Sequence, residues 1–248
     1  MKHKFLFILL FSLVLEGMVT TQAVAGDYVH QVNTLIGTKG TGLTSGYLYP
    51  GATYPYGMVQ FTPSYFSKRS GFVINQLSGG GCEHMGNFPT FPVKGKLKMS
   101  PDNILNYRIN VSEEKGHAGY YEAMVQEDIK AKLTVTERTG MASYEYPADQ
   151  QYGTIIIGGG ISATPIEQAA IVITAPNKCE GYAEGGNFCG LRTPYKVYFV
   201  AEFDTDAFET GTWKREELMP NTTFAEGEYS GVYFTFDVNK KKNIQYKI

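Results

Sequence analysis

The residues best suited to chemistry lie in a glycine-rich segment, residues 76–88, with the sequence QLSGGGCEHMGNF. Glycine lets the backbone approach a ligand closely, and carboxylate, imidazole and amide groups beside an aromatic ring suit a sugar, which is half apolar and rich in hydroxyls. The predicted substrate-binding residues are Gly80, Gly81, Cys82, Glu83, His84 and Asn87. By composition alone, the segment fits an ordered structural loop equally well.

Metal binding is a weaker interpretation of this segment. Cys82, Glu83 and His84 carry ligating atoms, but three consecutive side chains rarely converge on one ion. The whole chain has four histidines, and His3 belongs to the leader described below. No metal site is therefore predicted within the chain.

Neither nucleotide binding nor nucleophilic catalysis is predicted. Residues 154–164, TIIIGGGISAT, formally match a dinucleotide-binding fingerprint, but Thr164-Pro165 interrupts the helix that this motif requires. No serine lies in a nucleophile-elbow sequence. A pair of carboxylates for glycoside cleavage cannot be located from spacing, because acid and base usually come from separate elements. No catalytic residue is therefore assigned.

The three cysteines raise the question of a disulfide. Cys179 and Cys189 bracket a loop rich in Gly, Asn and Glu, CEGYAEGGNFC, and are the candidate pair for a loop-closing bridge in an exported chain. Cys82 is then left over, as a half-buried small residue.

The elements that position these residues are predicted to be strands. Apolar and polar residues alternate, which places one face of each strand on a core and the other in water. This pattern covers residues 129–135, 197–203 and 232–238. Shorter strands are predicted at residues 141–146, 154–157 and 168–174, and residues 214–219 could form one helical turn. The predicted fold class is all-β, a two-sheet antiparallel β-sandwich with long loops.

Composition agrees with a folded domain made of strands. The sequence is 43% hydrophobic, and its 28 glycines and 18 tyrosines against one tryptophan fit β-structure with many turns. The formal net charge of −2 provides no basic surface for nucleic acid, so no nucleic-acid partner is expected.

The two ends of the chain carry their own signals. Lys2 and Lys4 precede an apolar run from Phe5 to Leu15, and Ala23-Val24-Ala25 supplies small residues for cleavage, so residues 1–25 are predicted to be a signal peptide. We expect export to a periplasm or the medium, without a membrane span. The sandwich domain is assigned to residues 26–240. Residues 241–248 are predicted to begin a linker, although their short alternating pattern also fits a truncated or edge strand.

Several motifs resemble the N-terminal domain of glycoside hydrolase family 92. The most specific are glycine-rich: VNTLIGT at residues 32–38, YPGATYPYGMVQFTP at 49–63 and QLSGGGCEHMGNF at 76–88. Strand-like motifs follow in the family's order: GYYEAMV at residues 119–125, LTVTERTGMASYEYP at 133–147 and YKVYFVAEFD at 195–204. The resemblance covers nearly the whole chain after the leader.

The resemblance implies a function for a larger protein. The family consists of exported, calcium-dependent, exo-acting α-mannosidases, many of which degrade N-glycans or yeast mannan. It implies a β-sandwich of the galactose-mutarotase-like, supersandwich type, packed against an (α/α)6 catalytic barrel that this chain lacks. The reaction inverts the anomeric centre. A glutamate protonates the leaving oxygen and an aspartate assists water, and these groups and the main calcium ligands belong to the barrel.

The part of the family's site that carries over is small. Gly80, Gly81, Cys82 and Glu83 match a loop that approaches the active-site cleft from the sandwich, so their implied role is to line the pocket for a mannose-containing glycan and to brace the domain interface. Between Pro63 and Gly71 this chain is shorter than many members and lacks a tryptophan that some place near the leaving group. The expected function is that of a sandwich domain, inactive alone, whose barrel lies in cis or on a separate chain. The alternative is a free-standing carbohydrate-binding or partner-docking module.

Overall fold

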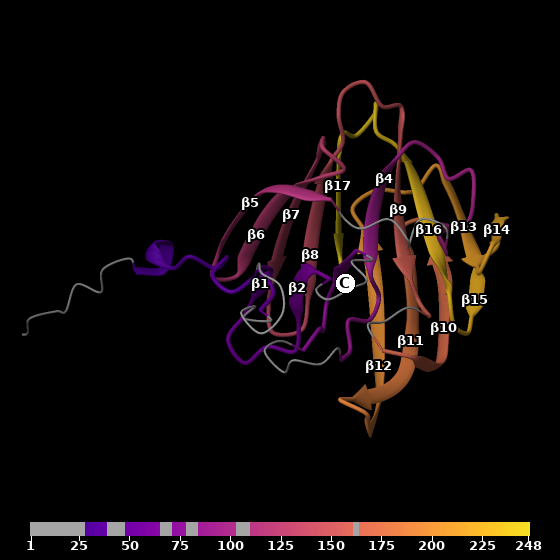
Figure 1. Ribbon diagram of the computed structural model, residues 1–248. Coiled ribbons are helices and arrows are strands. Elements are labelled where there is room, and N and C mark those ends of the chain that lie inside the picture. Colours follow the sequence, from indigo (N-terminus) through magenta and orange to yellow (C-terminus); the bar gives the residue numbers. More distant parts are fainter. Residues whose placement is uncertain (1–27, 39–47, 65–70, 78–83, 103–109, 161–163) are drawn as a thin grey trace, which may run out of the picture. The chain divides into compact units, whose positions relative to one another are not determined.

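The computed structural model describes residues 28–38, 48–64, 71–77, 84–102, 110–160 and 164–248. It divides into two compact units, Met1–Gln31 and Val32–Ile248. The described part of the first unit is one 3-10 helix, η1 (Tyr28–Gln31), and the predicted signal peptide, residues 1–25, lies outside the described residues. All the strands belong to the second unit (Figure 1). In the ranges just given, no helix is long and apolar enough to cross a bilayer.

The first of the two sheets has eight strands in the order β1-β2-β3-β4-β9-β16-β13-β14, and its neighbours pair antiparallel. Its strands are β1 (Ala52–Thr53), β2 (Gln60–Pro63), β3 (Phe72–Val73), β4 (Thr90–Lys94), β9 (Tyr152–Gly158), β16 (Ser230–Asp237), β13 (Glu209–Lys214) and β14 (Glu217–Pro220). The glycine-rich segment, residues 76–88, leads directly into this sheet, since β4 begins two residues after Phe88.

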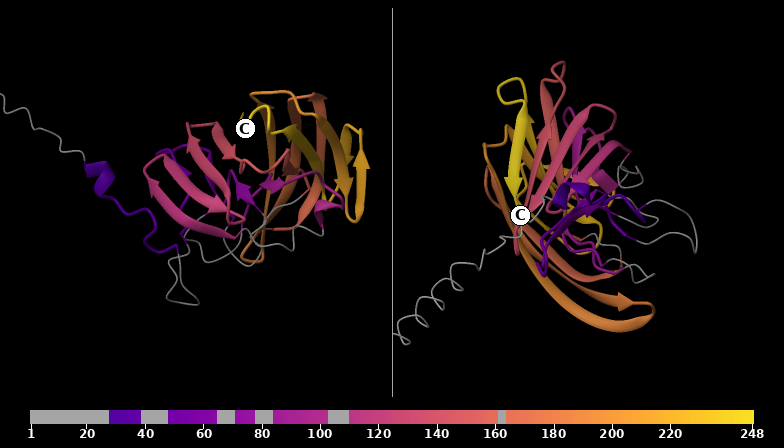
Figure 2. Two further views of the ribbon diagram at one scale, coloured as in Figure 1. Left: turned by 90° about the horizontal axis from the view of Figure 1, so that it is seen from above. Right: turned by 90° about the vertical axis from the view of Figure 1, so that its left-hand side faces the viewer.

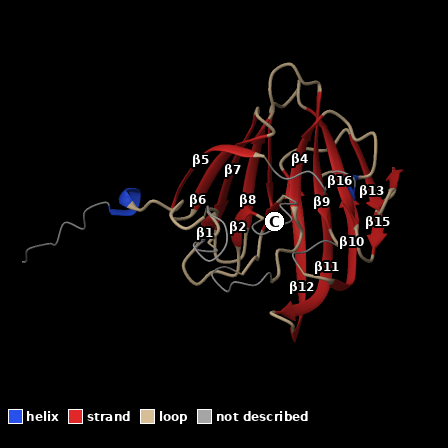
Figure 3. Cartoon of the chain, viewed as in Figure 1, coloured by secondary structure: helices blue, strands red, loops and turns tan. Residues whose placement is uncertain are grey.

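The second sheet has nine strands in the order β15-β10-β11-β12-β17-β8-β7-β6-β5, again antiparallel throughout. Its strands are β15 (Phe224–Glu226), β10 (Ile166–Ala175), β11 (Lys178–Phe188), β12 (Leu191–Phe203), β17 (Asn243–Lys247), β8 (Gly140–Glu145), β7 (Ile129–Val135), β6 (Tyr120–Val125) and β5 (Val111–His117). Figures 2 and 3 show that the described part of this unit consists of strands and their connections, apart from a short helical stretch at residues 101–102. The predicted all-β, two-sheet antiparallel sandwich is confirmed.

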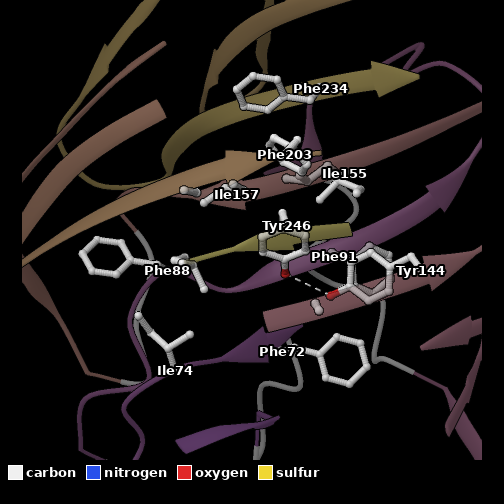
Figure 4. Close-up of a cluster of buried hydrophobic side chains, with 14 of the residues drawn as sticks. Phe72, Ile74, Phe88, Phe91, Tyr144, Ile155, Ile157, Phe203, Phe234 and Tyr246 are labelled. Atoms are coloured by element: carbon white, nitrogen blue, oxygen red, sulfur yellow. Dashed lines mark hydrogen bonds between the residues drawn. The ribbon is translucent and has the colours of Figure 1, made fainter. Parts of the chain in front are cut away.

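The core lies between the two sheets. Phe203 of β12 packs against Phe234 and Phe236 of β16, with ring centroids 4.7 Å and 5.1 Å apart, and against Tyr246 of β17 at 5.2 Å (Figure 4). Ile155 of β9 is buried in the same cluster. Large rings from alternate positions of facing strands thus fill the space between the sheets, as sandwich packing requires.

Three buried hydroxyl groups connect the sheets across this core. The Tyr246 hydroxyl donates to Thr90 Oγ1 of β4 at 2.6 Å, and the Tyr144 hydroxyl of β8 lies 3.2 Å from both of these oxygens. Tyr144, Tyr246 and Thr90 are at most 2% exposed. Buried hydroxyls are costly unless they are hydrogen-bonded, so this hydroxyl triangle fixes β4 relative to β8 and β17.

One strand is more deeply buried than its alternation predicts. Residues 232–238 were expected to have one face in water, but Tyr233 and Thr235 of β16 are as buried as Phe234. The connection after β4 covers this side: Gly95 accepts a hydrogen bond from Thr154 Oγ1, whose oxygen lies 2.8 Å from Thr235 Oγ1. The face of β16 that the local pattern placed in water is therefore covered by a segment that is distant in the sequence.

Two boundary predictions were wrong. Residues 241–248 do not begin a linker: Asn243–Lys247 form β17, which pairs with β8 on one side and β12 on the other. The alternating Ile244, Tyr246 and Ile248 side chains are buried, because the partners supplied by distant strands turn this short pattern into a central strand. Residues 214–219 form the β13–β14 hairpin instead of a helical turn.

We predict that Tyr246→Phe destabilises the domain by about 1 to 2 kcal/mol, because Thr90 and Tyr144 lose a buried hydrogen-bond partner. The measurement is urea-induced unfolding. The matched control is Tyr198→Phe, which removes a hydroxyl from a side chain that is mostly exposed and should change the free energy of unfolding little. Equal effects of the two substitutions would contradict a role for the hydroxyl triangle.

The burial of Tyr144 and Tyr246 leads us to predict that the domain loses stability at alkaline pH. Burial raises the pKa of the Tyr144 and Tyr246 phenols. In the unfolded chain these phenols ionise near pH 10, whereas in the folded chain they stay neutral, so stability is complete below about pH 10 and falls as the pH rises above it. Unfolding midpoints measured from neutral to alkaline pH should show this fall, and the Tyr144→Phe/Tyr246→Phe double variant should show a shallower one.

Candidate functional site

The structure describes two of the six predicted substrate-binding residues. His84 and Asn87 are both buried, whereas Gly80, Gly81, Cys82 and Glu83 lie outside the described residues. The two ends of the glycine-rich segment meet in an antiparallel bridge between Gln76 and Met85. The Leu77 amide donates to the His84 carbonyl at 3.2 Å. The two sides of this stem, Gln76–Leu77 and His84–Met85, are therefore joined by their backbones.

His84 attaches this stem to the tip of the β11–β12 hairpin. Its Nδ1 lies 3.1 Å from the carbonyl oxygen of Asn187, and since a carbonyl can only accept, Nδ1 carries the proton. The imidazole also packs edge-on against Phe188 and Tyr195, at centroid distances of 5.3 Å and 5.8 Å. His84, one of the predicted substrate-binding residues, thus holds together two segments that are 103 residues apart.

Asn87 holds the other end of the segment. Its backbone N–H donates to Asn75 Oδ1 at 2.8 Å, and its own Oδ1 accepts from Asn75 Nδ2 at 3.1 Å. The neighbouring residues Met85 and Phe88 have φ of 58° and 52°, in the left-handed region that costs energy for residues other than glycine. Phe88 is anchored by its ring, which lies 4.2 Å from that of Phe199. A conformation held against its local preference is typical of a functional segment.

Beside the hairpin tip is a polar hollow of about 260 Å³ that sequence reasoning did not find. Glu167, Asn187 and Arg192 line it, together with Pro165, Gly186 and Gly190. The Arg192 guanidinium lies 3.4 Å from the Glu167 carboxylate, and Asn187 Oδ1 accepts from the Gly190 amide. Guanidinium, carboxylate and amide groups can bind sugar hydroxyls. The charged and amide side chains come from three strands, β10, β11 and β12, so no local sequence signal joins them.

A second, larger depression lies along β12. This groove has a volume of about 730 Å³ and is lined mainly by apolar side chains, among them Met58, Ile74, Met85, Phe199 and Ile248. Asn75 and Tyr195 line it as well, so it adjoins the stem of the glycine-rich segment.

The predicted Cys179–Cys189 disulfide is wrong. Cys179 is a free, fully buried thiol at the start of β11, whereas Cys189 is disulfide-bonded and lies in the turn beyond the end of that strand. Ten residues of extended chain separate the two by about 30 Å, far beyond the reach of a disulfide. The sequence suggested a loop between them, but its Gly, Asn and Glu residues belong to β11, which pairs with β12 and has a shift of register between Gly185 and Asn187.

The glycines that formally match a dinucleotide-binding motif form a turn after β9 instead. Gly159 and Gly160 follow β9, and both of their amides donate to the Ser230 carbonyl. A Cβ on Gly160 would lie 1.9 Å from the Gly227 carbonyl oxygen, so only glycine fits this close approach.

The described residues do not fit a calcium ion. Within them, no group of three or more His, Cys, Asp or Glu side chains is placed to hold a metal. The pKa of the Glu122 carboxyl is lowered by the Tyr120 hydroxyl, and that of Glu145 by Lys242. These carboxylates lie on the outer face of the second sheet and are held ionised, whereas a general acid requires a raised pKa.

Comparison with known proteins places this geometry in context. The model of the glycosyl hydrolase family 92 N-terminal domain matches residues 31–248. A curated relative, an uncharacterised secreted glycosidase of Arthroderma benhamiae, is 30% identical over 159 residues, which are 55% of this chain and 20% of that protein.

Solved structures share the fold. The family 92 glycosyl hydrolase CcMan5 superposes with a TM-score of 0.75 at 22% identity, over 89% of this chain and 32% of its own. A family 92 α-mannosidase of Bacteroides thetaiotaomicron in complex with mannoimidazole gives 0.73 at 25%, over 88% and 32%. An inverting family 92 mannosidase of the same organism gives 0.69 at 22%, over 89% and 31%. The chain thus spans about a third of the length of these enzymes.

We predict that Cys189 is bonded to Cys82, the remaining cysteine of the chain, which lies outside the described residues. Peptide mapping of the non-reduced protein by mass spectrometry should recover a linked pair of peptides that contain these two cysteines. Cys179→Ser is the matched control and should leave this pair intact, whereas Cys189→Ser should abolish it. A linked peptide containing Cys179 would contradict the assignment.

Proposed function

This chain belongs to glycosyl hydrolase family 92, as its N-terminal domain, and from that premise we propose that it is the N-terminal part of an exo-acting, inverting α-mannosidase. The observation that carries the proposal is the family match over residues 31–248, supported by the likeness to a solved family 92 α-mannosidase in complex with mannoimidazole. The substrate is a mannose-containing glycan, for example an N-glycan.

We assign this domain a positioning role in the reaction. His84 and Asn87 hold the ends of the glycine-rich segment, so that Gly80, Gly81, Cys82 and Glu83 can form one wall of the mannose pocket. The polar hollow at the hairpin tip, with Asn187 and Arg192, is the neighbouring surface that could bind hydroxyls of the glycan.

Bond cleavage itself is assigned to the rest of the enzyme. An (α/α)6 catalytic domain, in cis or on a separate chain, supplies the acid and the group that activates water, and it holds the calcium ion. When bound, calcium helps to distort the mannose ring.

We also propose that the protein is exported. The positively charged start, the apolar run and the small residues before position 26 are typical of a signal peptide, and the curated relative is named as a secreted glycosidase. The destination is a periplasm or the medium, where a disulfide at Cys189 can persist.

The alternative, a free-standing carbohydrate-binding module, is favoured by one surface. Tyr182 and Tyr198 lie side by side on the outer face of the second sheet, with Lys196 Nζ 4.2 Å and 5.4 Å from their ring centroids. With Phe224 they line a shallow hollow of about 390 Å³. Exposed rings on a sheet are suitable for stacking on sugars.

We predict that the purified chain alone does not hydrolyse an aryl α-mannoside or mannobiose, with or without calcium, because the groups that break the bond lie elsewhere. Turnover by the chain alone would overturn the proposal. Calorimetric titration of the same chain with mannose distinguishes this proposal from the alternative. Millimolar or tighter binding would favour a free-standing carbohydrate-binding module.

In the full-length enzyme, His84→Ala should lower kcat/KM for an aryl α-mannoside by about 10- to 100-fold, because the segment at the pocket loses its attachment to Asn187. The matched control is His117→Ala on β5, a histidine whose ring stacks on Tyr120, far along the sheet order from the hairpin. Equal activity of the two variants would remove His84 from the proposed site.

A further inference from the structure

The outer face of the second sheet carries aromatic rings where four strands lie side by side. β15, β10, β11 and β12 are consecutive neighbours in this sheet (Figure 1). Tyr198 on β12 is 69% exposed and Phe224 on β15 is 54% exposed, whereas the residues that follow them, Phe199 and Ala225, are buried. Because alternate residues of a strand point to opposite faces, both rings point away from the core. Large apolar side chains gathered on one exposed face are typical of a binding surface.

The pairing of these strands defines a trough between the rings. Tyr182 of β11 is paired with Tyr198 on one side and with Ala170 of β10 on the other. Val172, two residues after Ala170, is paired with Phe224. The short side chains of Ala170 and Val172 therefore form the floor of this outer trough, and the rings form its walls. Its volume of about 390 Å³ is within the range of small-ligand sites, roughly 300–1,000 Å³.

The outer trough is wider than one sugar unit. Its walls belong to β15 and β12, which are three strand spacings apart in the sheet, and at about 4.8 Å per spacing the two strand axes are about 14 Å apart. A single pyranose ring stacked on Tyr198 would therefore not reach Phe224. A ligand that contacts both walls must be a chain of linked units.

A lysine of the chain itself already occupies the position of a cation between the two tyrosines. Lys196 Nζ lies 4.2 Å from the ring centroid of Tyr182 and 5.4 Å from that of Tyr198. It is ion-paired with Glu184, the residue directly opposite on β11. Aromatic rings beside a carboxylate are also typical of sites for quaternary ammonium groups. Here such a ligand would be repelled by Lys196, so the outer trough does not suit a cation.

One carboxylate in the outer trough is unpaired. Glu180 lines it and is paired in the sheet with Val172 and Val200, on the same face as the rings. Among the residues that the structure describes, no ion pair of Glu180 is found. An apolar protein surface docked here would bury this charge without a partner, which is costly. Sugar hydroxyls can donate to the carboxylate while the apolar faces of the sugar rings stack on the aromatic walls.

We propose that the outer trough is an accessory oligosaccharide-binding site, in which Tyr198 and Phe224 stack on sugar rings and Glu180 accepts a hydrogen bond from a hydroxyl. It lies on the face of β12 opposite to Phe199, the residue that contacts Phe88 of the glycine-rich segment, so it is separate from the candidate site. That the oligosaccharide contains mannose rests on the proposed function. A second contact with a polymeric or clustered glycan keeps the protein close to its substrate.

Titration of the isotopically labelled 248-residue chain with an α-linked mannotriose, followed by amide NMR, tests the proposal. Saturable shifts should appear around Ala170, Tyr182 and Tyr198. Phe224→Ala should raise the Kd by about 10-fold or more, because one wall is lost. The matched control is Phe208→Ala, which removes a ring of nearly equal exposure, 56%, from the connection before β13 and should leave the Kd unchanged.

Two further substitutions separate the ring from the hydroxyl and the acceptor from the charge. Tyr198→Phe keeps the stacking surface and should bind mannotriose nearly as well as the natural chain, whereas Tyr198→Ala should bind about 10-fold more weakly or worse. Glu180→Gln keeps an acceptor for a hydroxyl and should change the Kd less than Glu180→Ala does. These side chains are exposed, so the folded state should persist in all four variants.

Other outcomes overturn the proposal. No saturable shift with mannotriose means that the outer trough binds no oligosaccharide of this class. Equal affinity for mannose and mannotriose contradicts a ligand that spans both walls. Binding of choline at the same residues in place of mannotriose identifies a cation site. Because no bond is cleaved in the titration, its failure is distinct from failure of the proposed function, which would appear as absence of mannoside hydrolysis by the full-length enzyme.

Discussion

The hydroxyl triangle of Thr90, Tyr144 and Tyr246 is the contact on which the rest of the structure depends. It lies inside an otherwise apolar core, where an unbonded hydroxyl is costly, so the two sheets have one relative position in which all three oxygens are satisfied. Thr90 is also the first residue of β4, two positions after Phe88. The same contact that aligns the sheets therefore fixes the base of the glycine-rich segment.

β12 connects the core to the candidate site. Its Phe203 packs among the rings between the sheets, its Phe199 holds Phe88, and its Tyr195 contacts His84. One continuous strand thus sets the distance between the buried centre and the stem of the glycine-rich segment. A site built on a strand that is itself anchored in the core is held more precisely than one carried by loops alone.

The sequence predicted those features that depend on local pattern. Period-two alternation predicted β7 and β12, because a strand with one buried face alternates apolar and polar residues along the sequence. It did not foresee that both faces of β16 are buried or that β17 is a central strand, because each depends on segments far away in the chain. The contact between His84 and Asn187 and the hollow with Glu167 and Arg192 have the same non-local origin. Family resemblance supplied the function that no local pattern contained.

The complete burial of Cys179 has a consequence for how the oxidised protein matures. Burial raises the pKa of this thiol, so almost none of it is thiolate once β11 has paired with its neighbours. Because only thiolates attack disulfides, Cys179 in the folded chain does not scramble the bond at Cys189. Mispairing is confined to the time before the sheet closes, and the order in which β-sheet and bridge form decides how much help an isomerase must give.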